Sequence, residues 1–346
     1  MAKLLKTMLL SASLSLSLIA KAENPSTPAS KKSEKTAKVE SSKAPASQKP
    51  ESVKERFTVG ISQIVEHPSL DEVRKGTLDY LDANGFKDRI DVEYLNAQGN
   101  MGINAQIAKK LLGKRPDAIL AIGTPAAQAV INKNNHTPVV FTPISDPVGA
   151  RLAKSWDKPG GIATGTSDKS PIIKQIELIK EIHPQTKKIA ILYNPGEANS
   201  VSLVEQFKEA CKKLNLIPED GPVQNTTMVF ATASSVKADA IYVPTDNTVV
   251  SAIESVIKAG IAKKIPVFTA ESESVAKGAL ASLAVNYYKL GSQTGEMLAQ
   301  ILEKKSKPAN MPVQFQKEFE LHINMENAEK MGANISKEIL ARAVKH

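Results

Sequence analysis

The regular alternation of short apolar runs with amphipathic stretches, which begins at Phe57, most constrains the fold of this chain. The runs "FTVGISQIV", "AILAIG" and "PVVFTPI" are rich in β-branched residues, and helix-like stretches such as "SLDEVRKGTLDYLDANGF" separate them. Continuous runs of this kind are typical of parallel strands in a sheet whose two faces are covered by helices. The sequence therefore predicts an α/β fold.

The same order of elements occurs twice. "HTPVVFTPISDP" corresponds to "KIPVFTAESES", and "AIGTPAAQAVI" corresponds to "YVPTDNTVVSAI". We therefore expect two Rossmann-like, doubly wound lobes over residues 57–165 and 166–284. Leftover C-terminal segments usually complete the sheets, so we expect 285–312 to join the first lobe and 313–346 the second. Several chain crossings of this kind predict a hinge beside a cleft.

The N-terminal segment has the order of a secretory signal peptide. Lys3 and Lys6 precede an apolar run that ends in "AKA", which predicts cleavage after Ala22. Residues 23–56 are rich in Lys, Ser, Pro, Ala and Glu, a composition typical of a disordered linker. Because no cysteine follows the signal peptide, we expect no lipid anchor and a location in the periplasm.

The net charge of +9 is concentrated outside the predicted lobes, since residues 1–56 carry six of the nine charges. The basic balance is therefore poor support for nucleic-acid binding, and we expect no nucleic-acid partner. The single cysteine, Cys211, lies in a helical pattern and cannot form an internal disulfide, so we expect it to be buried.

Ligands of doubly wound sheets bind beyond the carboxyl ends of the strands. Those ends carry hydroxyl, amide and carboxylate side chains with few cations. Candidate ligand-binding residues at these ends are Gln63, Thr124, Ala126, Ser145 and Asp146 in the first half, and Glu197, Asp246, Asn247 and Glu271 in the second.

Two motifs face the same choice between a structural and a binding role. In "GTPAAQ", Thr124 is either only the helix N-cap or part of a site where free N–H groups hold a carboxylate. In "YVPTDNTVV", Asp246 is either the N-cap or a partner for an ammonium, because Asn247 and Thr248 could cap the helix instead. Together, Thr124 and Asp246 would bind a zwitterion.

Catalytic signatures are missing from the sequence. No GxGxxG follows a predicted strand, and neither GxxxxGK[ST] nor GxSxG occurs. The five histidines lack the spacing of metal ligands. We therefore expect no enzymatic activity, no metal site and no cofactor.

Six motifs together give the chain a resemblance to a known family: "VGISQIVEHPSLDEVRKGTLDYL", "ILAIGTPAAQAV", "VVFTPISDPVGARL", "ILYNPGEANSVSLVE", "AIYVPTDNTVVSAIESV" and "GALASLAVNYYKLGSQTGEMLAQIL". In order over most of 57–335, they resemble the substrate-binding proteins of ABC transporters, which include binding proteins for tryptophan and other aromatic amino acids. The resemblance does not explain the linker at 23–56.

The resemblance implies a type I periplasmic-binding-protein fold whose two lobes close on a small solute, which a membrane permease with an ATPase then takes in. We expect an amino acid as the ligand and a monomeric protein. It places Thr124 and Ala126 at the ligand carboxylate and adds Ser200 to the residues that border the cleft. Two alternatives stay open: a ligand-sensing regulatory module of the same fold, and an enzyme on an α/β scaffold.

Overall fold

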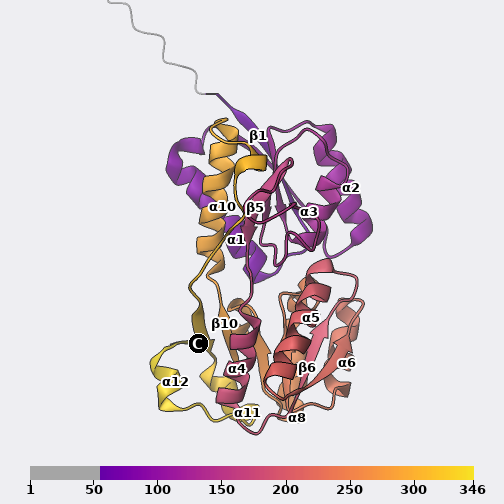
Figure 1. The fold of residues 1–346 in the computed structure, drawn as a ribbon, viewed down its shortest axis with the longest axis vertical. Coiled ribbons are helices and arrows are strands. Elements are labelled where there is room, and N and C mark those ends of the chain that lie inside the picture. Colours follow the sequence, from indigo (N-terminus) through magenta and orange to yellow (C-terminus); the bar gives the residue numbers. More distant parts are fainter. Residues whose placement is uncertain (1–54) are drawn as a thin grey trace, which may run out of the picture. The chain divides into compact units, whose positions relative to one another are not determined.

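The computed structural model describes residues 55–346. The predicted signal peptide at 1–22 and all but the last two residues of the predicted linker at 23–56 lie outside the described residues. The described chain forms two α/β lobes, each built around one sheet (Figure 1). We call the lobe of the first sheet the N-lobe and that of the second sheet the C-lobe.

The N-lobe sheet has the strand order β11-β5-β4-β3-β1-β2, and all of its pairs are parallel. Its strands are β1 (Phe57–Gln63), β2 (Ile90–Asn96), β3 (Ala118–Ile122), β4 (Val139–Thr142), β5 (Ala163–Ser167) and β11 (Gln314–Phe315). Its helical elements are α1 (Pro68–Leu81), η1 (Asp82–Phe86), α2 (Met101–Gly113), α3 (Thr124–Ile131), α10 (Tyr287–Leu302) and η3 (Pro308–Asn310).

The C-lobe sheet has the order β13-β12-β10-β9-β8-β6-β7, in which the β10–β12 pair is antiparallel. Its strands are β6 (Lys188–Tyr193), β7 (Ile217–Pro222), β8 (Ala240–Val243), β9 (Val267–Thr269), β10 (Ala281–Ala284), β12 (Glu320–Ile323) and β13 (Ala343–Lys345). Its helical elements are α4 (Ile172–Ile182), α5 (Ala198–Lys213), η2 (Thr226–Met228), α6 (Val229–Ser235), α7 (Asn247–Ser251), α8 (Ile253–Lys263), α9 (Glu273–Ala276), α11 (Met325–Lys330) and α12 (Lys337–Ala341).

The two sheets repeat one topology. In the N-lobe the first five strands follow the order β2-β1-β3-β4-β5, and in the C-lobe the next five follow β7-β6-β8-β9-β10. This is a doubly wound order whose switch point lies beside the first strand of each lobe. The predicted fold class is confirmed: two mostly parallel sheets, each flanked by helices.

Each lobe has its own apolar core. All five residues of β3 and all four of β8 are buried, as expected for central strands covered on both faces. Cys211 lies in the C-lobe core and is fully buried, as the sequence predicts. Burial raises the pKa of its thiol to about 12.

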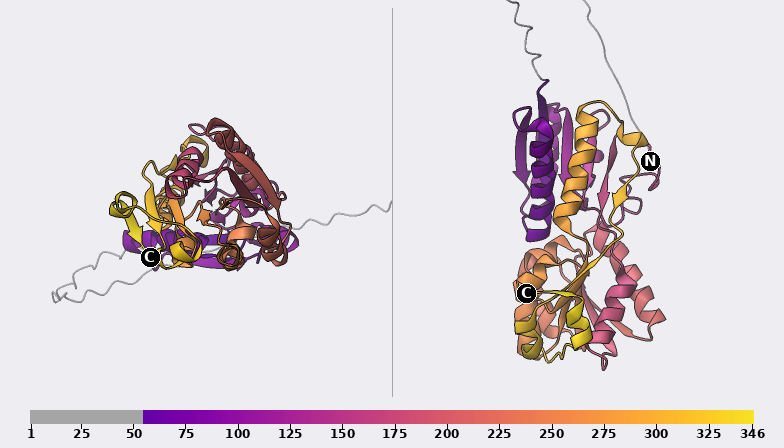
Figure 2. Two further views of the ribbon diagram at one scale, coloured as in Figure 1. Left: turned by 90° about the horizontal axis from the view of Figure 1, so that it is seen from below. Right: turned by 90° about the vertical axis from the view of Figure 1, so that its left-hand side faces the viewer.

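The chain crosses between the lobes three times, after β5, after β10 and after β11 (Figure 2). The sequence predicts lobe boundaries after residues 165, 284 and 312. β5 extends to Ser167 rather than 165, and β11 pairs with β5 beyond the boundary expected at 312. Two crossings are joined, because the Gln316 side chain bonds both the N–H and the carbonyl of Asn286. These paired crossings lie where the sequence predicts a hinge.

Helices α1 and α10 of the N-lobe pack unusually closely (Figure 2). A Cβ atom added at Gly76 would lie 2.2 Å from the carbonyl oxygen of Tyr288, and one at Gly291 would lie 2.2 Å from that of Val73. The two helix backbones therefore approach each other at these glycines. This contact fixes the position of α10, the helix that follows the second crossing, against α1.

We therefore expect Gly291→Ala to lower the free energy of unfolding by about 1–3 kcal/mol, because the methyl group overpacks a backbone contact. Gly113→Ala is the matched control, since a Cβ there meets nothing within 4 Å and alanine favours a helix. Denaturant unfolding of both variants measures the difference. Equal stability of the two variants would contradict the close packing.

Candidate functional site

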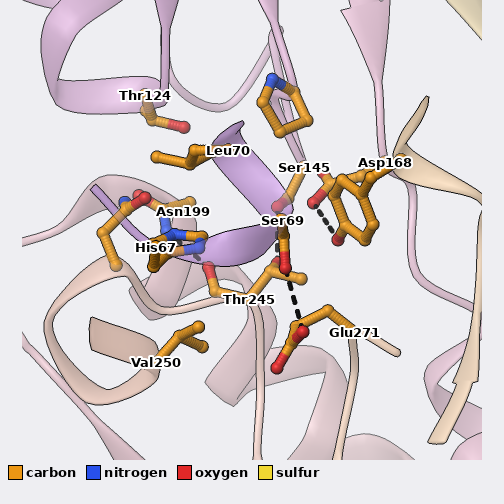
Figure 3. Close-up of a pocket in the computed structure, with 13 residues that line it drawn as sticks. His67, Ser69, Leu70, Thr124, Ser145, Asp168, Asn199, Thr245, Val250 and Glu271 are labelled. Carbon is orange, nitrogen blue, oxygen red and sulfur yellow. Dashed lines mark hydrogen bonds between the residues drawn. The ribbon is translucent and has the colours of Figure 1, made fainter. Parts of the chain in front are cut away.

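A cavity lies between the lobes, where the carboxyl ends of both sheets face each other (Figure 3). Its volume is about 20 Å³, counted as the space open to the centres of water-sized molecules, so the cavity is narrow in this arrangement. The side chains that line it come from both lobes and from two crossings: His67, Ser69, Leu70, Thr124, Pro143, Ser145, Asp168, Asn199, Thr245, Asn247, Val250, Glu271 and Tyr287. The cavity is at the switch point, where a ligand of this fold is expected.

The lobes touch each other around the cavity. The hydroxyls of Ser145 and Thr245 lie 2.9 Å apart, and Ser69 Oγ donates to Glu271 Oε2 at 2.9 Å. At the rim, Ser202 Oγ donates to Asp146 Oδ2 at 3.0 Å. Each of these contacts joins a residue of the N-lobe to a residue of the C-lobe, so together they report a closed cleft.

Four of the ten predicted site residues line the cavity: Thr124, Ser145, Asn247 and Glu271. The N-cap of α3 is Gly123, with φ of 91°, and not Thr124, which makes no capping bond. The first i→i−4 bond of the helix runs from Ala127 N to Gly123 O, so the N–H groups of Thr124 and Ala126 precede it. The capping alternative for Thr124 is therefore wrong, and its side chain faces the cavity.

For Asp246 the structural alternative holds, and the expectation that Asn247 or Thr248 caps the helix in its place is wrong. Asp246 is the N-cap of α7 and accepts from Val249 N at 2.7 Å. Its second oxygen accepts from Asn194 N and Ser200 Oγ, both at 2.6 Å. The carboxylate is fully buried and does not line the cavity. Its three hydrogen-bond donors all come from its own lobe.

Glu197 also has a structural place. Its Oε1 accepts from the N–H and the hydroxyl of Thr248, and its Oε2 accepts from Asn247. The two buried carboxylates, Glu197 and Asp246, therefore hold the N-terminus of α7. Burial, and then the neighbouring Glu197, raise the pKa of Asp246 to about 7.

The remaining predicted residues do not line the cavity either. The Gln63 side chain bonds Val65 O and Asp71, and Ala126 is buried in the N-lobe core. Ser200 donates to Asp246, and Asp146 lies at the rim, where it accepts from Ser202. In this closed arrangement, each of them supports a wall or the rim of the cleft.

Sequence reasoning missed the carboxylate that follows β5. Asp168 lines the cavity, is 4% exposed, and accepts from the Tyr287 hydroxyl at 3.1 Å through Oδ2. Burial raises its pKa, and the nearby hydroxyls of Ser145 and Tyr287 oppose that effect. Asp168 and Tyr287 both follow a strand end at a crossing, a signal that would have been visible had β5 been recognised in "GIATGTSDK".

Buried acceptors without a partner gather at this cavity. Among the described residues, Asp168 Oδ1, Asn199 Oδ1, Glu271 Oε1 and His67 Nδ1 are buried, belong to lining residues and have no hydrogen-bond partner. Burial lowers the pKa of His67 to about 4, so its ring is neutral near pH 7. Because buried polar groups are nearly always paired, the three free oxygen atoms, which can only accept, indicate a polar occupant that brings donors.

The lining side chains include two carboxylates, Asp168 and Glu271, and no lysine or arginine. A third carboxyl, Glu273, lies behind Ser69, whose Oγ is 3.1 Å from Glu273 Oε2. Burial, and then the neighbouring Glu271, raise the pKa of Glu273 to about 8. The charge of this region therefore favours a cationic group.

Within residues 55–346, no group of three or more His, Cys, Asp or Glu side chains is arranged to hold a metal ion. No helix among these residues has the length and apolarity needed to cross a membrane.

We expect Asp246→Asn to destabilise the fold by about 1–3 kcal/mol, because an amide nitrogen would face the N–H of Asn194 or Val249 in a buried site. Thermal unfolding of the ligand-free protein measures this. Asp220→Asn is the control, since the Asp220 side chain is 43% exposed. An unchanged midpoint for Asp246→Asn would show that its carboxylate is not needed for the fold.

Glu273 predicts a pH dependence of stability. Its pKa in the folded protein, about 8, exceeds the ordinary value of 4.5. Between these values the folded state binds more protons than the unfolded state, so the contribution of this group to stability falls as pH rises from 4.5 to 8. Glutamine cannot lose a proton there.

The unfolding midpoint of Glu273→Gln, measured by calorimetry relative to the unsubstituted protein, should therefore rise between pH 5 and pH 8 and level off above pH 8. Glu254→Gln, at a side chain that is 75% exposed, should show a constant offset. A constant offset for Glu273→Gln as well would contradict the raised pKa.

Solved structures of similar chains agree with the closed arrangement. A conserved domain protein from Vibrio cholerae is 43% identical with a TM-score of 0.82, and an ABC domain in complex with L-Trp from Streptococcus pneumoniae is 36% identical with a TM-score of 0.81. A ligand-free, open substrate-binding protein from Clostridium difficile is 38% identical, yet its TM-score is 0.64. Each alignment covers 84% of this chain and 99% of the other. The lobes are therefore arranged more as in the L-Trp complex than as in the open form.

Sequence comparison points to the same group of proteins. A tyrosine-binding protein of Clostridioides difficile is 41% identical over 275 residues, which are 78% of this chain and 79% of that protein. The family model described as ABC transporter substrate binding protein matches residues 58–346. With a match over nearly all of both lobes, the chain belongs to the family of ABC transporter substrate-binding proteins.

Proposed function

We propose that this protein is the solute-binding component of an ABC importer and that it binds an amino acid in the cavity between its lobes. The observation that carries the proposal is the set of buried, unpartnered acceptors on a closed interlobe cavity that contains two carboxylates. The ligands named for two relatives, tyrosine and L-Trp, support an aromatic amino acid.

The two charged groups of an amino acid fit two places on the N-lobe. The carboxylate suits the N-terminus of α3, where Thr124 lines the cavity and the first N–H groups carry the positive end of the helix dipole. The ammonium suits Asp168, whose Oδ1 has no other partner. Asp168 thus takes the role that the sequence suggested for Asp246.

Ser145, Asn247 and Glu271 supply further polar contacts from the cavity wall. Each lobe contributes part of the cavity lining, so a bound ligand contacts both lobes only when the cleft is closed. Binding therefore stabilises the closed state. We also propose that the protein acts as a monomer in the periplasm and delivers its solute to a permease and its ATPase.

The enzyme alternative has no support from the cavity. The serine closest to His67 in the chain, Ser69, bonds Glu271 and Glu273 rather than an imidazole. The regulatory-module alternative shares the fold, and the family match favours transport over it.

We expect Asp168→Asn to weaken amino-acid binding by at least about 30-fold, because removing one partner of a buried charge pair costs about 2 kcal/mol or more. The fold should persist, since the amide oxygen still accepts from Tyr287 and a buried carboxylate has been removed. Titration calorimetry with tyrosine and tryptophan measures the affinity.

Asp157→Asn, which removes the same charge from an exposed position, should bind as the unsubstituted protein does. Unchanged affinity in Asp168→Asn would remove Asp168 from the ligand site. Failure of the unsubstituted protein to bind any amino acid would overturn the proposed function.

A further inference from the structure

The C-lobe wall of the cavity contains two buried acceptors that the charged groups of an amino acid leave unexplained. They are Asn199 Oδ1 and Glu271 Oε1, on side chains that are 3% and 1% exposed. The ammonium and the carboxylate of an amino acid share one carbon atom, so their partners must lie close together. Thr124 and Asp168 both belong to the N-lobe, which leaves the side chain of the solute to face the C-lobe.

The free oxygen of Glu271 is fixed in place by the partners of the other oxygen. Oε2 accepts from Ser69 Oγ at 2.9 Å (Figure 3). It also accepts from Ser274 N, in the first turn of α9, at 3.0 Å. Because a backbone N–H can only donate, the atom beside Ser274 must be an oxygen acceptor. The carboxylate therefore presents Oε1 as a second, separate acceptor.

Asn199 is held in a similar way. Its amide nitrogen donates to Thr245 O at 2.9 Å. This bond fixes the orientation of the amide, and its oxygen, Oδ1, has no hydrogen-bond partner within residues 55–346. A carboxylate oxygen forms stronger hydrogen bonds than a neutral amide oxygen, so Glu271 is the dominant acceptor of the two. Leu70, Pro143, Val250 and Tyr287 give the same cavity apolar surface against which a ring can pack.

We propose that the solute carries a hydrogen-bond donor on its side chain and that Glu271 Oε1 accepts it. This inference rests on the proposed function and narrows the solute to amino acids whose side chain has an O–H or N–H, such as a phenol or an indole, against those with a plain phenyl or alkyl group. A solute without that donor leaves the Glu271 oxygen buried and unpaired when the cleft closes.

The test compares ligand pairs that differ by the donor alone. Tyrosine is compared with phenylalanine, and tryptophan with 3-(3-benzothienyl)alanine, in which sulfur replaces the indole N–H. Titration calorimetry on the unsubstituted protein and on its Glu271→Gln variant gives four affinities for each protein. In at least one pair, the unsubstituted protein should bind the donor-bearing member more than about 10-fold tighter, because sites built around a donor reject analogues that lack it.

Glu271→Gln should reduce that ratio to within about threefold. Ser274 N holds the amide oxygen at the Oε2 position, so the amide nitrogen takes the Oε1 position and faces the solute as a donor. The tryptophan pair is the sharper of the two, because an indole N–H can only donate whereas a phenol can also accept. Glu254→Gln is the matched control: its side chain is 75% exposed and does not line the cavity, so it should leave the affinities and their ratio unchanged.

The outcomes are distinguishable. If no amino acid binds the unsubstituted protein, the proposed function fails. If amino acids bind but both pairs are bound equally, the side-chain donor is not required and the inference is overturned. If Glu271→Gln weakens both members equally and keeps the ratio, Glu271 contacts the ammonium instead, and its assignment to the side chain is wrong.

Discussion

The C-lobe side of the cavity depends on a pair of buried carboxylates that never reach it. Asp246 ties α7 to the loop after β6 through Asn194 N and to α5 through Ser200, and Glu197 ties α5 back to α7 through Asn247 and Thr248. Two carboxylates this close and this buried are costly unless donors surround them. The surrounding N–H and hydroxyl groups meet that need, and they fix the loops that carry Asn199, Thr245 and Asn247.

The cavity differs from this carboxylate pair, because acceptor atoms on its lining have no donors within the described chain. Three oxygen atoms on its lining side chains, Asp168 Oδ1, Asn199 Oδ1 and Glu271 Oε1, lack partners among residues 55–346. A closed cleft lined with unpaired acceptors is unfavourable by itself, so a solute with matching donors gains affinity by pairing them as the lobes close. The location of Asp168 and Tyr287 on two crossings places this pairing next to the hinge, where small changes in backbone direction move whole lobes.

Much of the fold was visible in the sequence, and less of the site was. Alternating buried strands and amphipathic helices predicted two doubly wound lobes, because that pattern depends on residues close together in the chain. Thr124, Ser145, Asn247 and Glu271 were found because they follow strand ends, where ligands of such sheets bind. Asp168 was missed because β5 contains two threonines, a serine and a glycine and lacks a β-branched apolar run, so its end was not recognised.

The sequence by itself determined the class of fold, the duplication and the edge of each sheet where a ligand can bind. Only the tertiary structure decided which carboxylates are structural and which face the solute. Asp246 and Asp168 both follow a strand and both precede polar residues, so local pattern cannot separate them. The difference lies in partners: Asp246 meets donors brought from 46 and 52 positions away, whereas one oxygen of Asp168 meets none, and chain folding alone sets such distances.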